Sequence, residues 1–142
     1  MTTLIKQSLV GGIAGTLIMT LFMFIGQLAG MPKMNPAEML TMMMHIPLAM
    51  GWVLHFVIGI TFALMYALIF AKLLKRIRSH LLKGIIFGLV AFLIAQIAMT
   101  VMGPLFGDMP PVEGGMILMA MGSILGHIIF GIVVAYIVKG EV

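Results

Sequence analysis

Four long apolar runs restrict this chain to folds that suit a lipid bilayer. They cover residues 8–30, 46–71, 81–103 and 116–138, and each is long enough to cross the hydrocarbon core, which takes about 20 helical residues. Only 8% of the 142 residues are charged, whereas about a quarter are charged in a typical soluble domain. The sequence therefore predicts one all-α domain over residues 1–142, an integral membrane four-helix bundle in contact with the lipid bilayer.

The basic residues predict how these helices are oriented. A cluster between the second and third runs contains Lys72, Lys75, Arg76, Arg78 and Lys83. Lys6 precedes the first run and Lys139 follows the fourth. Lys33 lies between the first and second runs, on the opposite side of the bilayer from this cluster. Because Lys and Arg accumulate on cytoplasmic loops, both termini are expected inside, an N-in/C-in topology. The charges are too few and too localised to indicate nucleic acid as a partner.

Two halves of the chain repeat the same order of short motifs. Residues 5–71 and 78–139 each contain Gly-x-x-x-Gly, Met-Pro, Pro-x-Glu and His-x-x-x-Gly. The last motif begins at His55 in the first half and at His127 in the second. Each half holds two runs, so both enter the bilayer from the same side. This predicts two tandem helical hairpins, a parallel internal repeat about an axis along the membrane normal.

Small residues four positions apart predict where the helices touch. Lipid tails are as apolar as leucine, so helices in a bilayer associate through close packing and interhelical hydrogen bonds. Glycine lets two backbones approach closely. The glycines expected in helix contacts are Gly11, Gly15, Gly26, Gly30, Gly59, Gly84, Gly88, Gly122, Gly126 and Gly131.

Polar residues within the runs predict a hydrophilic interior for the bundle. Side chains that must form hydrogen bonds are unfavourable towards lipid and turn inwards. Those that share a helical face are Thr16, Thr20, Gln27, His55, Gln96, Thr100, Ser123 and His127. We expect them to lie together where the helices meet.

The loop after the first run predicts a short helix. Asn35 suits the N-cap position and Pro36 the first helical position. The helix should extend to about His45, because Pro47 follows shortly after. Its methionine-rich sequence predicts a lid lying in the outer interface of the bilayer.

The two histidines within the runs are candidates for ligand binding. An ionisable residue in a membrane span is by default a functional-site hypothesis. Two facing imidazoles could ligate a haem iron from both sides. The alternative is that His55 and His127 are neutral and form hydrogen bonds to Thr, Gln or Ser across the bundle.

Methionine is the second candidate, because thioether sulfur is a soft ligand for copper(I). The sequence contains 17 Met and no Cys, so thioether is the one soft ligand available. The densest cluster contains Met42, Met43 and His45, which makes these residues candidate metal ligands together with His55 and His127. The alternative is that Met fills irregular space where an adaptable surface meets a lid or a partner.

The segment Gly51-Trp52-Val53-Leu54-His55-Phe56-Val57-Ile58-Gly59, after a Met- and Pro-rich loop and before Tyr66, resembles one found in a family of small, uncharacterised bacterial membrane proteins with four spans. The resemblance covers most of the chain. It implies the four-helix fold and a location in the bacterial inner membrane, and it implies no activity.

The sequence contains no G-x-S-x-G, H-E-x-x-H, P-loop or dinucleotide-binding motif, so we do not expect an enzyme. The leading hypothesis is an accessory or scaffold subunit that binds another membrane protein or forms a homo-oligomer. One alternative is a haem or copper protein that uses His55 and His127. Another is a small transporter built on the parallel repeats.

Overall fold

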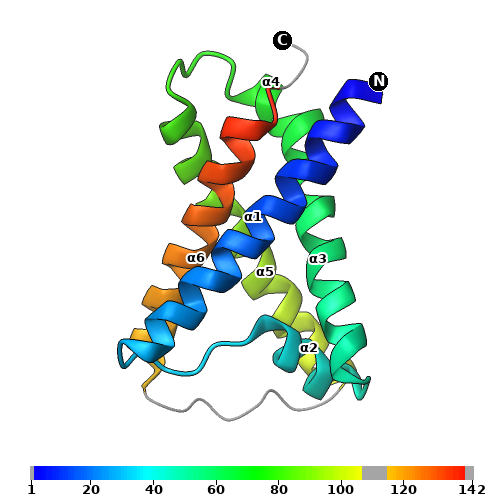
Figure 1. The fold of residues 1–142 in the computed structure, drawn as a ribbon, viewed down its shortest axis with the longest axis vertical. Helices are drawn as coiled ribbons and strands as arrows, with labels where there is room; N and C mark the ends of the chain where they lie inside the picture. Colours follow the sequence, from blue (N-terminus) through cyan, green and yellow to red (C-terminus); the bar gives the residue numbers. More distant parts are fainter. Residues whose placement is uncertain (1, 107–114, 140–142) are drawn as a thin grey trace.

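The computed structural model describes residues 2–106 and 115–139, and within these ranges it contains helices and no strand (Figure 1). The long helices are α1 (Thr2–Leu28), α3 (Leu48–Met65), α5 (His80–Phe106) and α6 (Met116–Ile137). A π-helix, η1 (Tyr66–Phe70), and α4 (Ala71–Leu73) continue α3. Four helices, counted with this continuation, are long and apolar enough to cross a membrane. The predicted all-α chain with four apolar helices is confirmed, and it is a multi-pass membrane protein.

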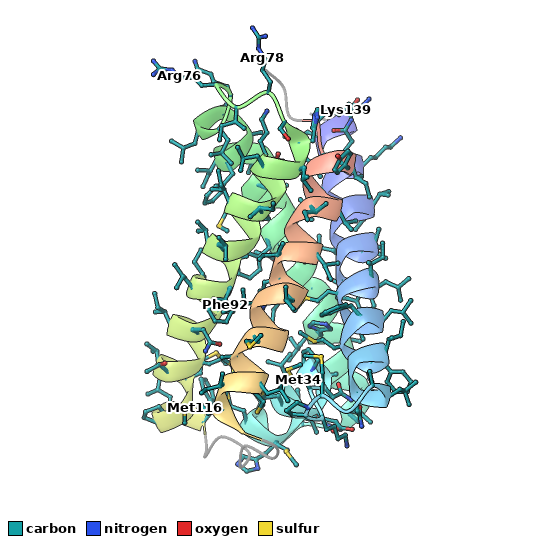
Figure 2. The ribbon with its side chains drawn as sticks, turned by 90° about the vertical axis from the view of Figure 1, so that its left-hand side faces the viewer. Met34, Arg76, Arg78, Phe92, Met116 and Lys139 are labelled. Carbon is teal, nitrogen blue, oxygen red and sulfur yellow. The ribbon has the colours of Figure 1, made fainter. Side chains whose placement is uncertain are left out.

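The long helices pack in the order α3, α1, α6, α5 (Figure 1). Helix α1 runs obliquely and contacts both α3 and α6, and α6 contacts α5, whereas α3 and α5 do not pack extensively against each other. Both described ends of the chain lie at one end of the molecule, where the backbone amide of Lys139 donates to Oε1 of Gln7 at 3.1 Å. We call this the terminal end, and it carries Arg76, Arg78 and Lys139; Met34 and Met116 lie towards the opposite end (Figure 2).

Two glycine contacts bring the helix backbones together. A Cβ atom on Gly12 of α1 would lie 2.8 Å from the backbone N of Ile60 and 3.0 Å from the carbonyl of Gly59. On α5, a Cβ on Gly84 would lie 2.8 Å from the N of Ile132 and 2.9 Å from the carbonyl of Gly131. The second contact uses residues 72 positions after those of the first. Any side chain at either glycine would force the pair of helices apart.

The remaining glycines of the predicted set mostly lie at helix contacts. A Cβ on Gly11 would meet Val138, one on Gly15 would meet Phe130, and one on Gly88 would meet His127 and Ile128. On α6, Gly122 lies against Met31 and Met34, and Gly126 lies against Met19 and Met23. These thioether side chains fill the space that the glycines leave. Met19 and Met23 belong to α1, whereas Met31 and Met34 belong to the segment that follows it.

Gly26 and Gly30 do not form the helix-packing face that their spacing predicted. Helix α1 ends at Leu28, and Gly30 has a φ of 95° with nothing within 4 Å of its added Cβ. The amide of Met31 donates to the carbonyl of Gly26, and that of Gly30 donates to Gln27. This is the Schellman pattern, in which a glycine with positive φ ends a helix. The pair terminates α1 because Gly30 alone can adopt this φ without strain.

The short helix predicted after the first run is present as α2 (Pro36–Met44). Oδ1 of Asn35 accepts hydrogen bonds from the amides of Ala37 and Glu38, at 3.1 and 3.3 Å, as an N-cap does. The helix packs on α3, where Gly51 lies against the carbonyl of Ala37. Helix α2 marks the end of the bundle opposite the termini, which we call the α2 end (Figure 1).

Some boundaries differ from those predicted. The third run was expected to end at residue 103, but α5 continues through Pro104 to Phe106. A proline in the last turn removes a single backbone hydrogen bond, so the helix need not stop there. Helix α3 begins at Leu48, directly after Pro47. The second Met-Pro and Pro-x-Glu motifs, residues 109–113, lie outside the described residues.

An aromatic cluster closes the bundle near the terminal end. Phe87 of α5 is fully buried, and its ring centroid lies 4.9 Å from that of Tyr66 and 5.1 Å from that of Phe70. Phe130 of α6 joins them, 6.3 Å from Phe87. The π-helix supplies both Tyr66 and Phe70. This cluster therefore links the end of α3 to α5, although the two helices pack little elsewhere.

Candidate functional site

A cavity of about 1030 Å³ lies between α3 and α5. Residues of α1 and α6 form its inner wall, and residues of α2 cover it at the α2 end. Phe130 of the aromatic cluster and Phe62, whose ring centroid lies 6.5 Å from that of Phe130, bound it towards the terminal end. The cavity exists because α3 packs against α1 and α5 packs against α6, while α3 and α5 contact each other mainly through the aromatic cluster at the end of α3.

The mouth of the cavity lies between the two helices that do not pack together. Ile58 of α3 and Ile94 of α5 line the cavity and are 40% and 38% exposed. Thr61 and Gln96, on the same two helices, are also exposed lining residues. Because both helices are long enough to span a membrane, the cavity opens sideways, towards the position of the lipid chains.

His55 lies on the wall of the cavity and is held by a neighbouring helix. Its side chain is buried, and its Nε2 atom lies 3.1 Å from Oγ1 of Thr20 on α1. The rings of Trp52 and Phe56 pack edge-on against it, with centroids 6.2 and 6.1 Å away. His55 thus joins α3 to α1 and has a fixed ring orientation.

His127 lies on the same cavity but is bonded differently. Its Nδ1 atom lies 2.8 Å from the carbonyl oxygen of Ser123, one turn earlier on α6. Because a carbonyl oxygen only accepts, Nδ1 must carry the hydrogen, and in the neutral ring Nε2 then holds the lone pair. The ring packs edge-on against Phe92 of α5, with the centroids 5.6 Å apart. The imidazoles of His55 and His127 line the same cavity.

Nε2 of His127 faces open space within the cavity. Among the described residues it has no hydrogen-bond partner. In the described part of the chain, the polar side-chain atoms that are both fully enclosed and unpaired are the hydroxyls of Ser8, Thr16 and Thr41. Nε2 of His127 is not among them, so it is accessible. His127 therefore offers the cavity a nitrogen that accepts a hydrogen bond or binds a metal ion.

The structure brings most of the predicted polar residues to this region. Thr16, Gln96 and Ser123 line the cavity with the two histidines, and Thr20 contacts His55. Thr16 is buried with its hydroxyl directly over Gly59. Gln27 lies instead in a second cavity of about 190 Å³, next to Thr20 and near α2.

Thr100 does not join the predicted interior. It is exposed on α5, and its hydroxyl donates to the carbonyl of Gln96 at 2.8 Å. A threonine that bonds to the preceding turn of its own helix needs no partner from another helix. Helical spacing predicted one face for both residues, but Gln96 lies at the cavity mouth and Thr100 outside it.

The methionine and histidine cluster of α2 does not converge on one point. Met43 is buried, Met42 is 56% exposed, and His45 is exposed at the C-cap of the helix with a φ of 52°. Within the described residues, no group of three or more His, Cys, Asp or Glu could hold a metal ion. Thioethers do line the large cavity, from Met19, Met23, Met34, Met39, Met42, Met44, Met65, Met99, Met102, Met116 and Met119.

Phe92 is a site residue that the sequence analysis missed. It contacts His127 and stands 72 positions after Thr20, the residue that contacts His55. The spacing between the two His-x-x-x-Gly motifs is the same, so it could have identified Phe92. Hydropathy alone could not, because Phe92 is one of many apolar residues in its run.

No curated protein and no solved structure matches this chain. The family comparison gives a single assignment that covers nearly the whole sequence. It confirms the resemblance to an uncharacterised family, because residues 2–140 match a family of unknown function (DUF6789), and the chain belongs to that family.

Proposed function

We propose that this membrane protein binds a lipid-like molecule in the cavity between α3 and α5. The observation that carries this proposal is the cavity itself, whose volume of about 1030 Å³ lies at the upper end of the roughly 300–1,000 Å³ usual for small-molecule sites. Such sites are mostly apolar with a few polar groups that fix orientation. Here the polar groups include His55, His127, Ser123 and Gln96.

The position of the mouth supports entry from the bilayer. The exposed residues on its two sides come from α3 and α5, and they include Ile58 and Ile94. Thr61 and Gln96 add polar groups at this mouth, but it opens at the depth of the lipid chains, so a lipid already lies beside it. Helix α2, capped by Asn35, covers the α2 end of the cavity.

We further propose that the bound molecule serves another membrane protein, so that this chain is a non-enzymatic accessory subunit. Helix α5 supports this role because it is the least buried of the four spans. Only 17% of its most apolar 18-residue segment is buried within the protein. It leaves a long face for a partner or a second copy of the chain. Co-purification from membranes at native expression tests this role: a stoichiometric partner or a homo-oligomer is expected, and a monomer without partner would contradict it.

The parallel repeat and the topology are part of the proposal. Glycine contacts at Gly12 and Gly84, related by 72 positions, support two tandem copies of one hairpin. The position of Arg76, Arg78 and Lys139 at the terminal end (Figure 2) supports an N-in/C-in topology in a bacterial inner membrane. With this orientation, α2 and the mouth of the cavity belong to the outer half of the bilayer.

The binding proposal is tested by filling the cavity. Ala95 of α5 lines it, so Ala95→Trp should remove the lipid that co-purifies with the protein, as measured by native mass spectrometry from a mild detergent. Ile97, on the same helix, is 64% exposed and does not line the cavity. The control Ile97→Trp should retain the lipid. Equal lipid content in both variants and the native protein would contradict the proposal.

One observation favours a second candidate, a haem or copper protein. Nε2 of His127 is open to a cavity that is lined by thioethers, and imidazole with thioether is a ligand set for both metals. His55 supports the haem version less, because its Nε2 contacts Thr20. The expected result is a Soret band after haem loading, or retained copper after Cu(I) loading and dialysis, lost in His127→Phe. Neither signal in the native protein would remove this candidate.

A further inference from the structure

The cavity also indicates what kind of head group its ligand carries. We infer that the ligand is a neutral lipid alcohol or quinol whose O–H group donates a hydrogen bond to Nε2 of His127. This inference rests on the proposed function and narrows the class of molecule that the cavity binds.

The hydrogen bond of Nδ1 determines whether Nε2 of His127 needs a hydrogen-bond donor or an acceptor from the ligand. Nδ1 already donates to the carbonyl of Ser123, so the neutral ring presents an acceptor, not a donor, to the cavity. A polar atom that loses water without gaining a partner is destabilising. The occupant that satisfies Nε2 must therefore bring a donor, which an ester, a ketone or a quinone does not have.

The charges of the cavity exclude an anionic head group next to His127. Among the described lining residues, the charged ones are Lys33 and Glu38. They pair with each other at 2.9 Å, next to α2. A phosphate or carboxylate deep in the cavity would meet no net positive charge there, and an unpaired ion in an apolar surrounding is strongly unfavourable. The head group must therefore be neutral.

The rest of the lining suits a long apolar chain. Methionine side chains such as Met99, Met102 and Met119 line the cavity on α5 and α6. Unbranched thioether side chains adapt to ligands of different shape. With its hydroxyl at His127, the molecule would extend its chain along these residues and out between α3 and α5. Diacylglycerol-type lipids and quinols both have this combination of O–H group and long chain.

Trp52 provides a probe for this site. It is the single tryptophan of the sequence. It lines the smaller cavity, and its ring lies 6.2 Å from that of His55, which lines the large cavity. Bromine atoms on a bound chain should therefore quench its fluorescence. The measurement compares a bromine-labelled long-chain alcohol with its methyl ether, which differs by the loss of the donor, and with the corresponding fatty acid, using native protein in lipid nanodiscs.

The alcohol should bind about tenfold more tightly than the ether, as expected for one hydrogen bond in an apolar site, and the fatty acid should bind more weakly than the alcohol at neutral pH. In His127→Phe, which keeps a ring against Phe92, alcohol and ether should bind equally. His80→Phe is the matched control, because His80 is exposed, stacks on Tyr136 and does not line the cavity. It should retain the native preference.

Unlabelled diacylglycerol and a quinol then compete with the brominated alcohol, and the one that displaces it identifies the source of the ligand. Equal binding of alcohol and ether by the native protein would overturn the inference and leave the proposed function intact. Displacement by a quinone as effective as by its quinol would also overturn it. No quenching by any brominated probe would contradict the proposed function itself.

Discussion

Oγ1 of Thr20 lies 3.1 Å from Nε2 of His55, so a hydrogen bond joins α1 to α3 on the wall of the cavity. At His127 the corresponding neighbour is Phe92, which offers no hydrogen bond, and the imidazole bonds to its own helix instead. The two histidines look equivalent in the sequence, but they have different partners. His55 connects two helices, whereas His127 keeps a nitrogen available to a ligand.

Replacing Thr20 by valine should therefore weaken the α1–α3 contact. Interhelical hydrogen bonds in membrane proteins contribute about 0.6 kcal/mol on average and up to roughly 1.7 kcal/mol, and Thr20→Val should lower the free energy of unfolding within that range. Unfolding by SDS titration from mixed micelles measures it. Thr61→Val is the control, because the exposed hydroxyl of Thr61 bonds to Val57 of its own helix. A loss as large in the control would show that the contact with His55 contributes nothing.

Phe87→Ala should loosen the terminal end of the bundle. Phe87 is fully buried and contacts Tyr66, Phe70 and Phe130, and truncation of a buried Phe costs about 3–5 kcal/mol in protein cores. Because this cluster links α5 to the end of α3, amide exchange should accelerate in η1 as well as in α5. Leu93→Ala, at a position 57% exposed, should leave both rates unchanged. Exchange confined to α5 would contradict the link.

Hydropathy was sufficient to predict the four helices, because each run is far more apolar than its neighbours. Asn35 and Pro36 likewise predicted the start of α2, since capping depends on local chemistry. The cavity could not be predicted, because it results from how α3 and α5 diverge, and apolar residues cover most of the surface of both helices. The spacing of Gly26 and Gly30 predicted a helix contact, but a glycine four positions after another also suits a helix end with positive φ.

Single cysteines test the proposed topology, since the native chain contains no Cys. Ser79 is exposed in the segment between α4 and α5, and Ala29 is exposed at the opposite end of α1. With both termini inside, Ala29→Cys should react with a membrane-impermeant maleimide in intact cells. Ser79→Cys should react only after permeabilisation. The reverse pattern would place the basic cluster outside and the mouth of the cavity in the inner half of the bilayer.

Gly59 and Thr16 should show a coupled response to substitution. A Cβ on Gly59 would overlap the hydroxyl of Thr16, so Gly59→Ala should destabilise the protein by about 1–3 kcal/mol, as overpacking does in cores. At Gly131, 72 positions later, the facing residue is Gly88 instead of threonine. Thr16→Gly should therefore restore part of the stability of Gly59→Ala, because it recreates the glycine pair of α5 and α6. A double-mutant cycle of SDS unfolding measures the interaction energy, and additive effects would show that the overlap does not determine the spacing of α1 and α3.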